Sequence, residues 1–517
     1  MMKSQEETSR NLRLIVNSSY VVLIGVILSK IISYFYKIIV ARGFGPEIFG
    51  LFSLGLIIVG IVGAAASLGL AEGLLRYVSF YRGKKESNKI KFIVNRAVKL
   101  MFFTSILGAL LLFAFSDFIS TVLLNEPELS YFLKILGISL PFSMLSGAFV
   151  SIIRAFENIR AYSFLVNVLH NLLKVFFLLI LLWVGLKRDA ILFSYVLAYV
   201  GLFFVSYWIT SKQLKSVAAR KKELSGIEKE NIARSLFSYS WPLVFSSILL
   251  NLFFWIDSLI LGIFTNAESV GLYNAAITIV GLFSIAQDLF MQIFIPVISR
   301  NLSLGKKEVI KEVSKQVFKW ILIINLPLFL ILFLFPGVII NLFFGAEYLF
   351  AEDALKILAL GALFSGFMSL FIGLISTKGK TKKTLAMFIV FSVLNVILDI
   401  ILIPIYGIEG AASATAIVWV IFTITLFINI KKEYGFYPIK KAAIKIAFVS
   451  IIPSLILYVM SENLIPNLPN LILSGVVFAV IYILLIFITK SLDNNDWEII
   501  NSIKTKFGLD GSYLSRE

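Results

Sequence analysis

The sequence predicts an all-α polytopic membrane protein with about fourteen transmembrane helices. The chain has 517 residues, of which 59% are hydrophobic and only 15% are charged, against about 25% charged residues in a typical soluble domain. Its apolar residues occur in runs of roughly 18 or more, which is typical of helices that cross a bilayer. Mean hydropathy is +0.94, yet the formal net charge is +17. These features exclude a soluble enzyme, a secreted disulfide scaffold and a disordered chain.

The apolar stretches are each long enough to cross about 30 Å of hydrocarbon. We expect spans at residues 16–40, 47–75, 97–123, 131–153, 161–185, 190–210, 237–263, 268–297, 318–344, 354–376, 384–405, 410–430, 444–461 and 470–489. Several are longer than a bilayer requires, and we expect these to tilt or to extend beyond it. The first stretch is too long for a signal peptide and contains Lys30, so we interpret it as the first span.

The Lys and Arg residues between the spans predict the orientation of the chain. With the N-terminus in the cytoplasm, about 39 of the 47 basic residues lie in or beside cytoplasmic connections, and about three lie in outward connections. Basic residues concentrate in the cytoplasmic loops of membrane proteins. We therefore expect a multi-pass protein with both termini in the cytoplasm. The basic charge sets this topology and forms no single patch for nucleic acid.

The two halves of the sequence are similar at an offset of about 221 residues. Gly50 aligns with Gly271, and Gly185 aligns with Gly407. Spans 1–6 and 7–12 are therefore expected to form two parallel six-helix lobes, an architecture of transporters with the substrate path at the repeat interface. The expected division is an N-terminal lobe at 1–210, a charged cytoplasmic linker at 211–236, a C-terminal lobe at 237–430, two further spans at 431–490 and a cytoplasmic tail at 491–517.

The chain lacks the residues that several classes of catalysis require. It has no cysteine and one histidine, His170, so thiolate chemistry, Cys-ligated or His-paired metal sites and a Ser-His-Asp triad are excluded. We expect no metal, no catalytic residue and no cofactor. An enzyme such as a polysaccharide polymerase, ligase or glycosyltransferase is disfavoured, because the sequence has neither a large outward loop nor a DxD triplet.

Several cations lie inside predicted spans. Each ionisable group there costs roughly 2.5–3.5 kcal/mol on insertion scales, so it usually faces a cavity or a partner. Lys30 lies near the middle of the first span, and Lys37 follows on the same helical face. In the fifth span, Asn171 and Lys174 share one polar face. These residues are candidates for binding a phosphate-bearing headgroup. The alternatives are snorkelling of Lys37 to the outer interface and a packed polar seam in the fifth span.

Two arginines and four polar residues complete the candidate site. Arg76 and Arg154 lie at the inner ends of the second and fourth spans, where they are placed to receive a diphosphate from the cytoplasm. The alternative interpretation is ordinary topology charge. The candidates for binding a coupling ion, H⁺ or Na⁺, or for forming a gate with a lysine of the other lobe, are Asp257, Asp288, Asn395 and Asp399.

Two stretches of the sequence resemble signatures of a known family. The first is Val40–Tyr81, VARGFGPEIFGLFSLGLIIVGIVGAAASLGLAEGLLRYVSFY, which resembles the first-hairpin signature of polysaccharide and oligosaccharide flippases. The second is Leu394–Val418, LNVILDIILIPIYGIEGAASATAIV, which is similar to the second-half signature. These flippases form the polysaccharide transporter branch of the multidrug/oligosaccharidyl-lipid/polysaccharide exporter superfamily.

The resemblance implies a flippase for oligosaccharides linked to polyprenyl (di)phosphate, moving them from the cytoplasmic to the outer leaflet of the plasma membrane for surface polysaccharide or glycan biosynthesis. It implies two lobes that rock around a central cavity by alternating access. Membrane lipid and a polysaccharide polymerase or glycosyltransferases are the implied partners. Direct use of ATP is not implied, and the chain contains no GxxxxGK[ST] loop.

Two alternatives belong to the same superfamily: a flippase for the peptidoglycan precursor and a multidrug exporter. A drug exporter selects organic cations and is expected to place acids deep in the first lobe. The first lobe here carries Lys30, Lys37 and Lys174 at depth instead, which favours an anionic substrate.

Overall fold

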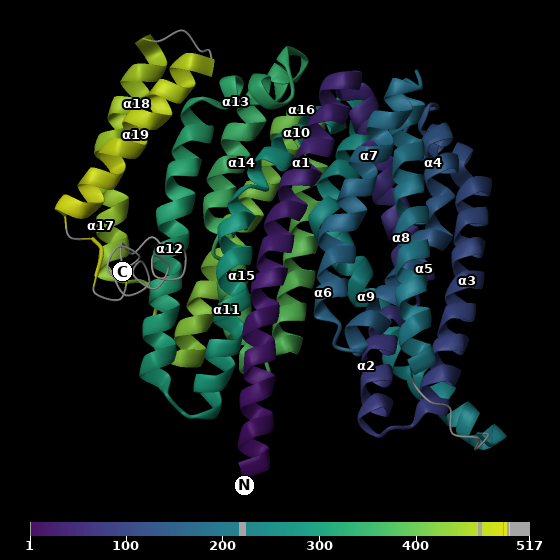
Figure 1. Cartoon of the computed structure of the whole chain (residues 1–517). Helices are drawn as coiled ribbons and strands as arrows, with labels where there is room; N and C mark the ends of the chain where they lie inside the picture. The colour runs from purple at the N-terminus through teal and green to yellow at the C-terminus, as the bar shows by residue number, and fades with distance from the viewer. Residues whose placement is uncertain (1, 217–223, 464–467, 490, 494–495, 497–517) are drawn as a thin grey trace, which may run out of the picture.

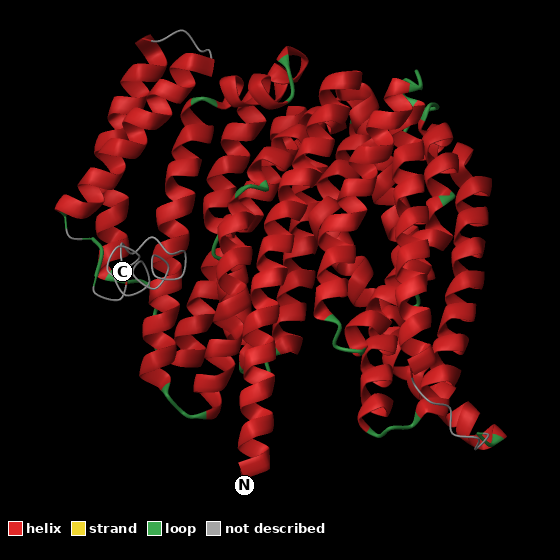
Figure 2. Ribbon diagram, viewed as in Figure 1, coloured by secondary structure: helices red, strands yellow, loops and turns green. Residues whose placement is uncertain are grey.

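The protein is a bundle of helices packed side by side (Figures 1 and 2). The computed structural model describes residues 2–216, 224–463, 468–489, 491–493 and 496. Every regular element in these ranges is a helix, and no strand occurs within them. The all-α class predicted from the sequence is confirmed.

The first half of the chain packs on one side of the bundle, coloured purple to blue in Figure 1, and α1 runs along its boundary with the second half. Its α-helices are α1 (Met2–Ala66), α2 (Leu70–Gly83), α3 (Ser87–Phe118), α4 (Leu129–Gly137), α5 (Ser139–Ala155), α6 (Ile159–Ser163), α7 (His170–Trp183) and α8 (Asp189–Ser216). Two π-helical turns, η1 (Ile119–Leu123) and η2 (Phe164–Leu169), continue α3 and precede α7.

The second half contributes a matching set of helices. They are α9 (Gly226–Phe264), α10 (Ala267–Val280), α11 (Phe283–Ser303), α12 (Lys307–Leu334), α13 (Pro336–Phe343), the 3₁₀ turn η3 (Ala346–Ala351), α14 (Glu352–Ser365), α15 (Met368–Thr377) and α16 (Thr381–Tyr434). The last helices, α17 (Lys441–Val449), α18 (Ile451–Asn463) and α19 (Leu468–Ile488), stand at the edge of the bundle beside α12 (Figure 1).

Glycines break the two longest helices. Gly45 in α1 has φ 78° and ψ 174°, and Gly407 in α16 has φ 57° and ψ −125°. A residue with a Cβ rarely adopts such angles. Gly185, the repeat partner of Gly407, also has a positive φ of 93°. The two matched positions therefore share an unusual backbone conformation, and each long helix covers two of the expected spans.

The number of spans depends on how bent helices are counted. Eight described helices are long and apolar enough to cross a membrane, and up to eleven if each of three bent pairs is one span. Two of the eight, Gly25–Ala66 and Thr381–Tyr434, contain the glycine breaks described above. The count of about fourteen stays a prediction.

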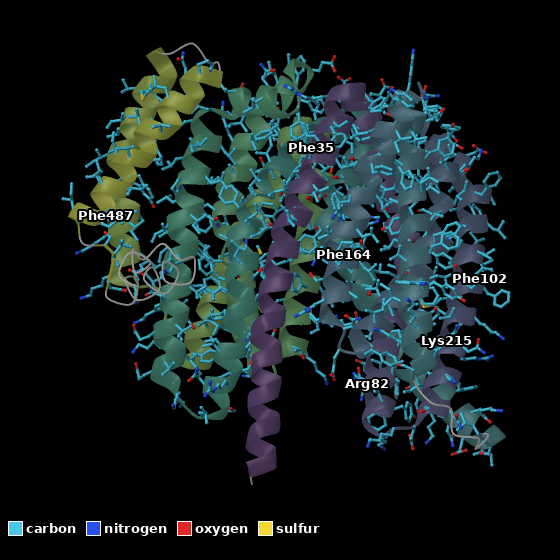
Figure 3. All side chains as sticks on the ribbon, viewed as in Figure 1. Phe35, Arg82, Phe102, Phe164, Lys215 and Phe487 are labelled. Carbon is cyan, nitrogen blue, oxygen red and sulfur yellow. The ribbon has the colours of Figure 1, made fainter. Side chains whose placement is uncertain are left out.

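The outer surface of the bundle is apolar around its sides. Phe102 points away from the bundle on one side and Phe487 lies at the opposite edge (Figure 3). Trp183, with 89% of its surface exposed, is an extreme case. Arg82 and Lys215 both lie at the same end of the bundle (Figure 3). An apolar belt with basic residues at one end is the surface that a bilayer requires.

The two halves meet where α1 crosses α10. A Cβ atom added to Gly50 would overlap the carbonyl of Ala267, and one added to Gly271 would overlap the carbonyl of Pro46. The two helices therefore touch through their backbones. Gly50 and Gly271 are the pair that the internal repeat aligns, and matched residues facing each other are typical of a contact around a two-fold axis.

The helices on either side of the expected linker extend into it. Helix α8 continues to Ser216 and α9 begins at Gly226, inside the range 211–236. Ser225 caps α9, because its hydroxyl accepts from the Glu228 amide at 3.2 Å while the Glu228 carboxylate accepts from the Ser225 amide at 3.0 Å. Residues 217–223, and most of the tail expected at 491–517, lie outside the described residues.

An ionic cluster ties the C-terminal helices to α12. Lys319 of α12 is fully buried and forms salt bridges with Asp496, which is also fully buried, and with Asp493 at 3.3 Å. Lys440, just before α17, donates to Asp493 at 2.8 Å and to the Gln316 side chain at 2.5 Å. Buried charges persist only where they are paired. The cluster therefore fixes the residues before α17 and after α19 against α12.

Removing the central lysine of this cluster should destabilise the protein. Lys319→Ala leaves the Asp496 carboxylate buried without its cation, and breaking a buried pair in this way costs about 3–5 kcal/mol. We expect a lower midpoint temperature of thermal unfolding for the purified protein in detergent. Lys311→Ala is the matched control on the same helix, because Lys311 pairs with the exposed Glu308, and should change stability by less than about 1 kcal/mol.

The stabilisation that this ionic cluster provides should depend on pH. Burial raises the pKa of the Asp493 carboxyl, but the hydrogen bond from Lys440 and the charge of Lys319 outweigh it and lower the pKa from 3.8 to about 2. The stabilisation is therefore complete above about pH 4 and is lost as the pH falls through about 2. The midpoint temperature of the wild type should fall more steeply over this range than that of Asp493→Asn. Equal pH profiles, or equal effects of the two lysine variants, would contradict the assigned role.

A candidate binding chamber between the two lobes

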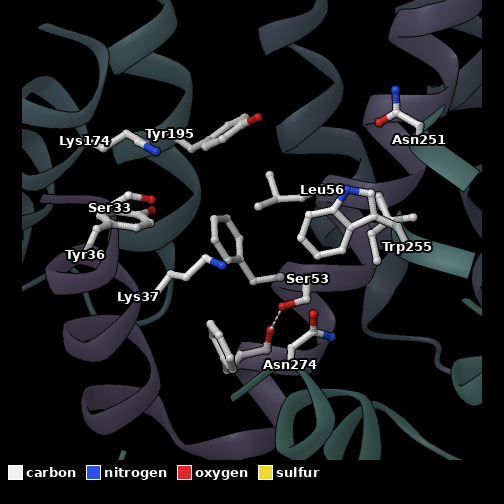
Figure 4. Close-up of a pocket in the computed structure, with 13 residues that line it drawn as sticks. Ser33, Tyr36, Lys37, Ser53, Leu56, Lys174, Tyr195, Asn251, Trp255 and Asn274 are labelled. Carbon is white, nitrogen blue, oxygen red and sulfur yellow. Dashed lines mark hydrogen bonds between the residues drawn. The ribbon is translucent and has the colours of Figure 1, made fainter. Parts of the chain in front are cut away.

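A cavity carrying two lysines lies between the two halves of the chain, and we call it the lysine cavity. Its volume is about 170 Å³. Lys37 enters it from α1 and Lys174 from α7, while Asn251 and Trp255 of α9 line the opposite side (Figure 4). Two of the lysines that the sequence singles out therefore share one cavity, although they belong to different helices.

Neither lysine of this cavity is neutralised by a carboxylate. Lys37 donates a hydrogen bond to the Thr278 hydroxyl at 3.2 Å, and the Lys174 Nζ lies 5.3 Å from the centre of the Tyr36 ring. Among the described residues, no Asp or Glu forms a salt bridge with either lysine. The two lysine side chains line the same cavity. An anion placed between them would be stabilised by both charges.

A larger cavity of about 610 Å³ adjoins the first, and we call it the acidic cavity. Its walls come from α9, α10, α11, α14, α15 and α16, all in the second half of the chain. Asp257 and Asp288 are its charged lining residues. Trp255 lines both cavities. The chamber thus has a cationic part beside the first lobe and an acidic part inside the second.

A cluster of buried polar groups stands at one wall of the acidic cavity. Asp257 accepts hydrogen bonds from the Tyr273 hydroxyl at 3.0 Å and from the Thr415 hydroxyl at 2.7 Å. Asp399 is fully buried, and within the described part of the chain neither of its carboxylate oxygens, nor the Asn395 Nδ2, has a hydrogen-bond partner of ordinary geometry. Asp399 is close enough to Asp257 to interact with it electrostatically. Buried unpartnered carboxylates are costly, so this cluster has the character of a site for a proton or a small cation.

An ion pair joins the two lobes beside the acidic cavity. Lys30 of α1 forms a salt bridge with Asp288 of α11 at 2.7 Å and also donates to the Ser284 hydroxyl. The side chains are 24% and 43% exposed. The pair is therefore accessible and links helices of opposite lobes. The structure pairs Lys30 with Asp288 and does not place Lys30 in the lining of either cavity; substrate binding by Lys30 and a gate formed with Asp288 both stay predictions.

The remaining candidate residues lie outside both cavities. Arg76 is exposed, with its guanidinium 4.1 Å from the centre of the Tyr239 ring on α9. Arg154 is exposed, and its guanidinium carbon lies 5.2 Å from the centre of the Tyr162 ring. Asn171 is buried and donates to the Ser29 hydroxyl at 2.9 Å, which ties α7 to α1. None of these three residues lines either cavity, although Asn171 lies three residues before Lys174 on α7.

Sequence reasoning missed most of the uncharged residues that shape the chamber. Trp255 and Asn251 lie one helical turn apart on α9, and Tyr36 precedes Lys37. The sequence pattern also did not single out Thr415, whose hydroxyl is the closest hydrogen-bond donor to the Asp257 carboxylate. Aromatic and hydroxyl residues are common in membrane spans, so only their contacts distinguish these. One face of α9 carries Asn251, Trp255 and Ser258, and this spacing is the sequence signal that could have identified a polar face.

Comparisons with known proteins place the chain among transporters. The family model described as polysaccharide biosynthesis protein matches residues 15–302, and the MatE model matches residues 242–401. The probable low-salt glycan biosynthesis flippase Agl15 of Haloferax volcanii is 29% identical over 259 residues, covering 48% of this chain and 52% of that protein. The putative O-antigen transporter of Shigella flexneri is 24% identical over 388 residues, covering 73% of this chain and 88% of that protein.

A solved structure shares the fold. The lipid II flippase MurJ in an inward closed conformation superposes with a TM-score of 0.70 at 18% identity, covering 90% of this chain and 98% of that chain. The named relatives and this neighbour are transporters and flippases, not enzymes. The family resemblance expected from the two signatures is confirmed. Since the first family model spans more than half of the sequence, the chain belongs to the polysaccharide biosynthesis protein family, a family of membrane transporters.

Proposed function

We propose that this protein moves an oligosaccharide linked to polyprenyl (di)phosphate from the cytoplasmic to the outer leaflet, for surface polysaccharide or glycan biosynthesis. The observation that carries the proposal is the pair Lys37 and Lys174, which face one cavity and have no carboxylate partner among the residues that the structure describes. Two uncompensated cations inside a membrane protein call for an anionic ligand. The names of the Haloferax and Shigella relatives support a glycan substrate.

The same chamber accommodates a second candidate. The diphosphate of a peptidoglycan precursor lipid presents the same charge to Lys37 and Lys174, and the fold is similar to that of the lipid II flippase MurJ. A multidrug exporter for organic cations is the weaker alternative, because a cation entering the lysine cavity would be repelled. The glycan attached to the carrier is therefore the point on which the two flippase hypotheses differ.

We further infer that transport proceeds by alternating access in the plasma membrane, with both termini in the cytoplasm. The two lobes are joined at Gly50 and Gly271 and by the pair Lys30 and Asp288, so a change of access requires these contacts to rearrange. A polysaccharide polymerase or glycosyltransferases are the partners that would consume or supply such a substrate.

Reconstitution in liposomes tests the proposed transport directly. A fluorescent polyprenyl-diphosphate oligosaccharide should become accessible to a membrane-impermeant reagent faster in proteoliposomes than in empty vesicles. Lys37→Ala and Lys174→Ala should each lower the rate roughly tenfold or more, because a hydrogen bond to a charged group contributes about 1.5–3 kcal/mol. Lys356→Ala is the control, since Lys356 pairs with Asp353 outside the chamber. No stimulation over empty vesicles would refute the flippase proposal.

Locking the ion pair between the lobes should stop transport. The chain has no cysteine, so the double variant K30C/D288C can be crosslinked with a short reducible thiol linker without background labelling. We expect transport to cease on crosslinking and to return on reduction, because Lys30 and Asp288 belong to helices of different lobes. The two single cysteine variants, treated in the same way, are the controls. Full transport by the crosslinked protein would show that this contact does not move.

We propose that Asp257, Asn395 and Asp399 bind the coupling ion, H⁺ or Na⁺. Oxygen ligands suit hard cations, and the Thr415 hydroxyl adds another oxygen beside Asp257. The unpartnered carboxylate oxygens of Asp399 support this assignment. A bound cation or proton would supply the positive charge that the buried pair of carboxyls lacks.

Neutralising the buried carboxyl should remove the ion dependence. Wild-type transport should respond either to Na⁺ at fixed pH or to pH at fixed Na⁺. The transport rate of Asp399→Asn is expected to lose that response. Thr415→Val should weaken the same response. Asp353→Asn serves as the control, because Asp353 is exposed and outside the chamber. An unchanged ion response in both chamber variants would exclude this site.

A further inference from the structure

One side chain separates the two parts of the chamber. Trp255 lines the lysine cavity on one side and the acidic cavity on the other, and it is the residue that the two sets of lining residues share. It is half-buried, so part of its surface is open to the chamber. In Figure 4 the indole lies across the lysine cavity from Lys37 and Lys174. A ligand held by these lysines and reaching into the second cavity must pass the indole.

The two cavities differ in what they can bind. The lysine cavity offers two positive charges, whereas the acidic cavity offers carboxylates, amides and hydroxyls. The described lining of the acidic cavity includes Asp257 and Asp288 but no Lys or Arg, so a diphosphate is held more favourably between Lys37 and Lys174 than in this cavity. Gln287, Ser365 and Asn395 also line it and can donate or accept hydrogen bonds. This is a lining suited to a neutral polyhydroxylated group.

The indole matches one face of a sugar. A pyranose ring carries C–H groups on its faces and hydroxyls around its edge, so an aromatic face can cover the former while polar groups bind the latter. Two asparagines line the same cavity as Trp255: Asn251 lies one turn away on the same helix, and Asn274 belongs to α10. Asn274 is held in place, because its Nδ2 donates to the Ser258 hydroxyl at 3.1 Å.

We propose that Trp255 is the residue that recognises the glycan. The diphosphate occupies the lysine cavity, the first sugar stacks on the indole, and the following sugars extend into the acidic cavity. This inference rests on the proposed function and adds to it a division of the headgroup between two subsites. Trp255 thereby distinguishes a glycosylated carrier from a bare one, while Lys37 and Lys174 bind both.

Two probes that differ by one sugar test this division. The first is a short isoprenyl diphosphate, and the second is the same diphosphate carrying one neutral hexose. Binding to the full-length protein in detergent is measured by calorimetry. For Trp255→Ala we expect the Kd of the hexose probe to rise at least tenfold, while the Kd of the bare diphosphate changes less than about twofold. Trp255→Phe should give an intermediate Kd for the hexose probe.

Further variants separate the possible failures. Trp241→Ala, an exposed tryptophan on the same helix that lies outside both cavities, should bind both probes like the wild type. Lys37→Ala should weaken both probes equally. If Trp255→Ala weakens both probes alike, or neither, then the indole does not recognise the sugar, although a phosphate site remains. If the wild type binds neither probe, then the proposed function itself fails.

Discussion

The structure depends on the direct backbone contact between α1 and α10. Gly50 and Gly271 leave no room for a Cβ atom on either helix, so the two lobes meet as closely as two helices can. Thr278 lies seven residues beyond Gly271, about two turns along α10, and there its hydroxyl accepts the hydrogen bond from Lys37. The glycine contact therefore also positions the hydroxyl that holds the Lys37 side chain. A larger residue at either glycine would separate the lobes and move this hydroxyl away from the lysine.

The distribution of charge follows from the same arrangement. The cations of the chamber project from α1 and α7, and its acids project from α9, α11 and α16. Lys30 and Asp288 neutralise each other across the boundary, whereas Lys37 and Lys174 have no carboxylate partner among the described residues. Ions withdrawn from water are stable only with a counter-charge. The chamber thus holds two cations whose electrostatic cost a bound anion would relieve.

The sequence predicted the helical class, the internal repeat and the helices that carry buried charge, because hydropathy and spacing depend on local order along the chain. It did not predict which faces meet. Lys30 and Lys37 share one helical face, yet only Lys30 is paired with an acid. No sequence pattern marked Trp255 as a binding residue, because its role depends on two cavities whose walls come from many helices. Helix boundaries do not give the span count directly, because Gly45 and Gly407 each break a helix at a single residue and two spans follow one another there without a loop between them.

The position of the chamber gives substrate binding a means to change the lobes. A ligand can shift a conformational equilibrium only by binding one arrangement more tightly than the other. A headgroup that contacts Lys37 and Lys174 in the first lobe and Trp255 in the second senses the distance between the lobes, because these residues lie on opposite walls of one cavity. A ligand confined to the acidic cavity would contact only the second lobe, whose helices form its walls, and would not sense that distance. The coupling between binding and lobe movement therefore requires a headgroup that spans the lysine cavity from Lys37 and Lys174 to Trp255, which a diphosphate joined to a sugar provides.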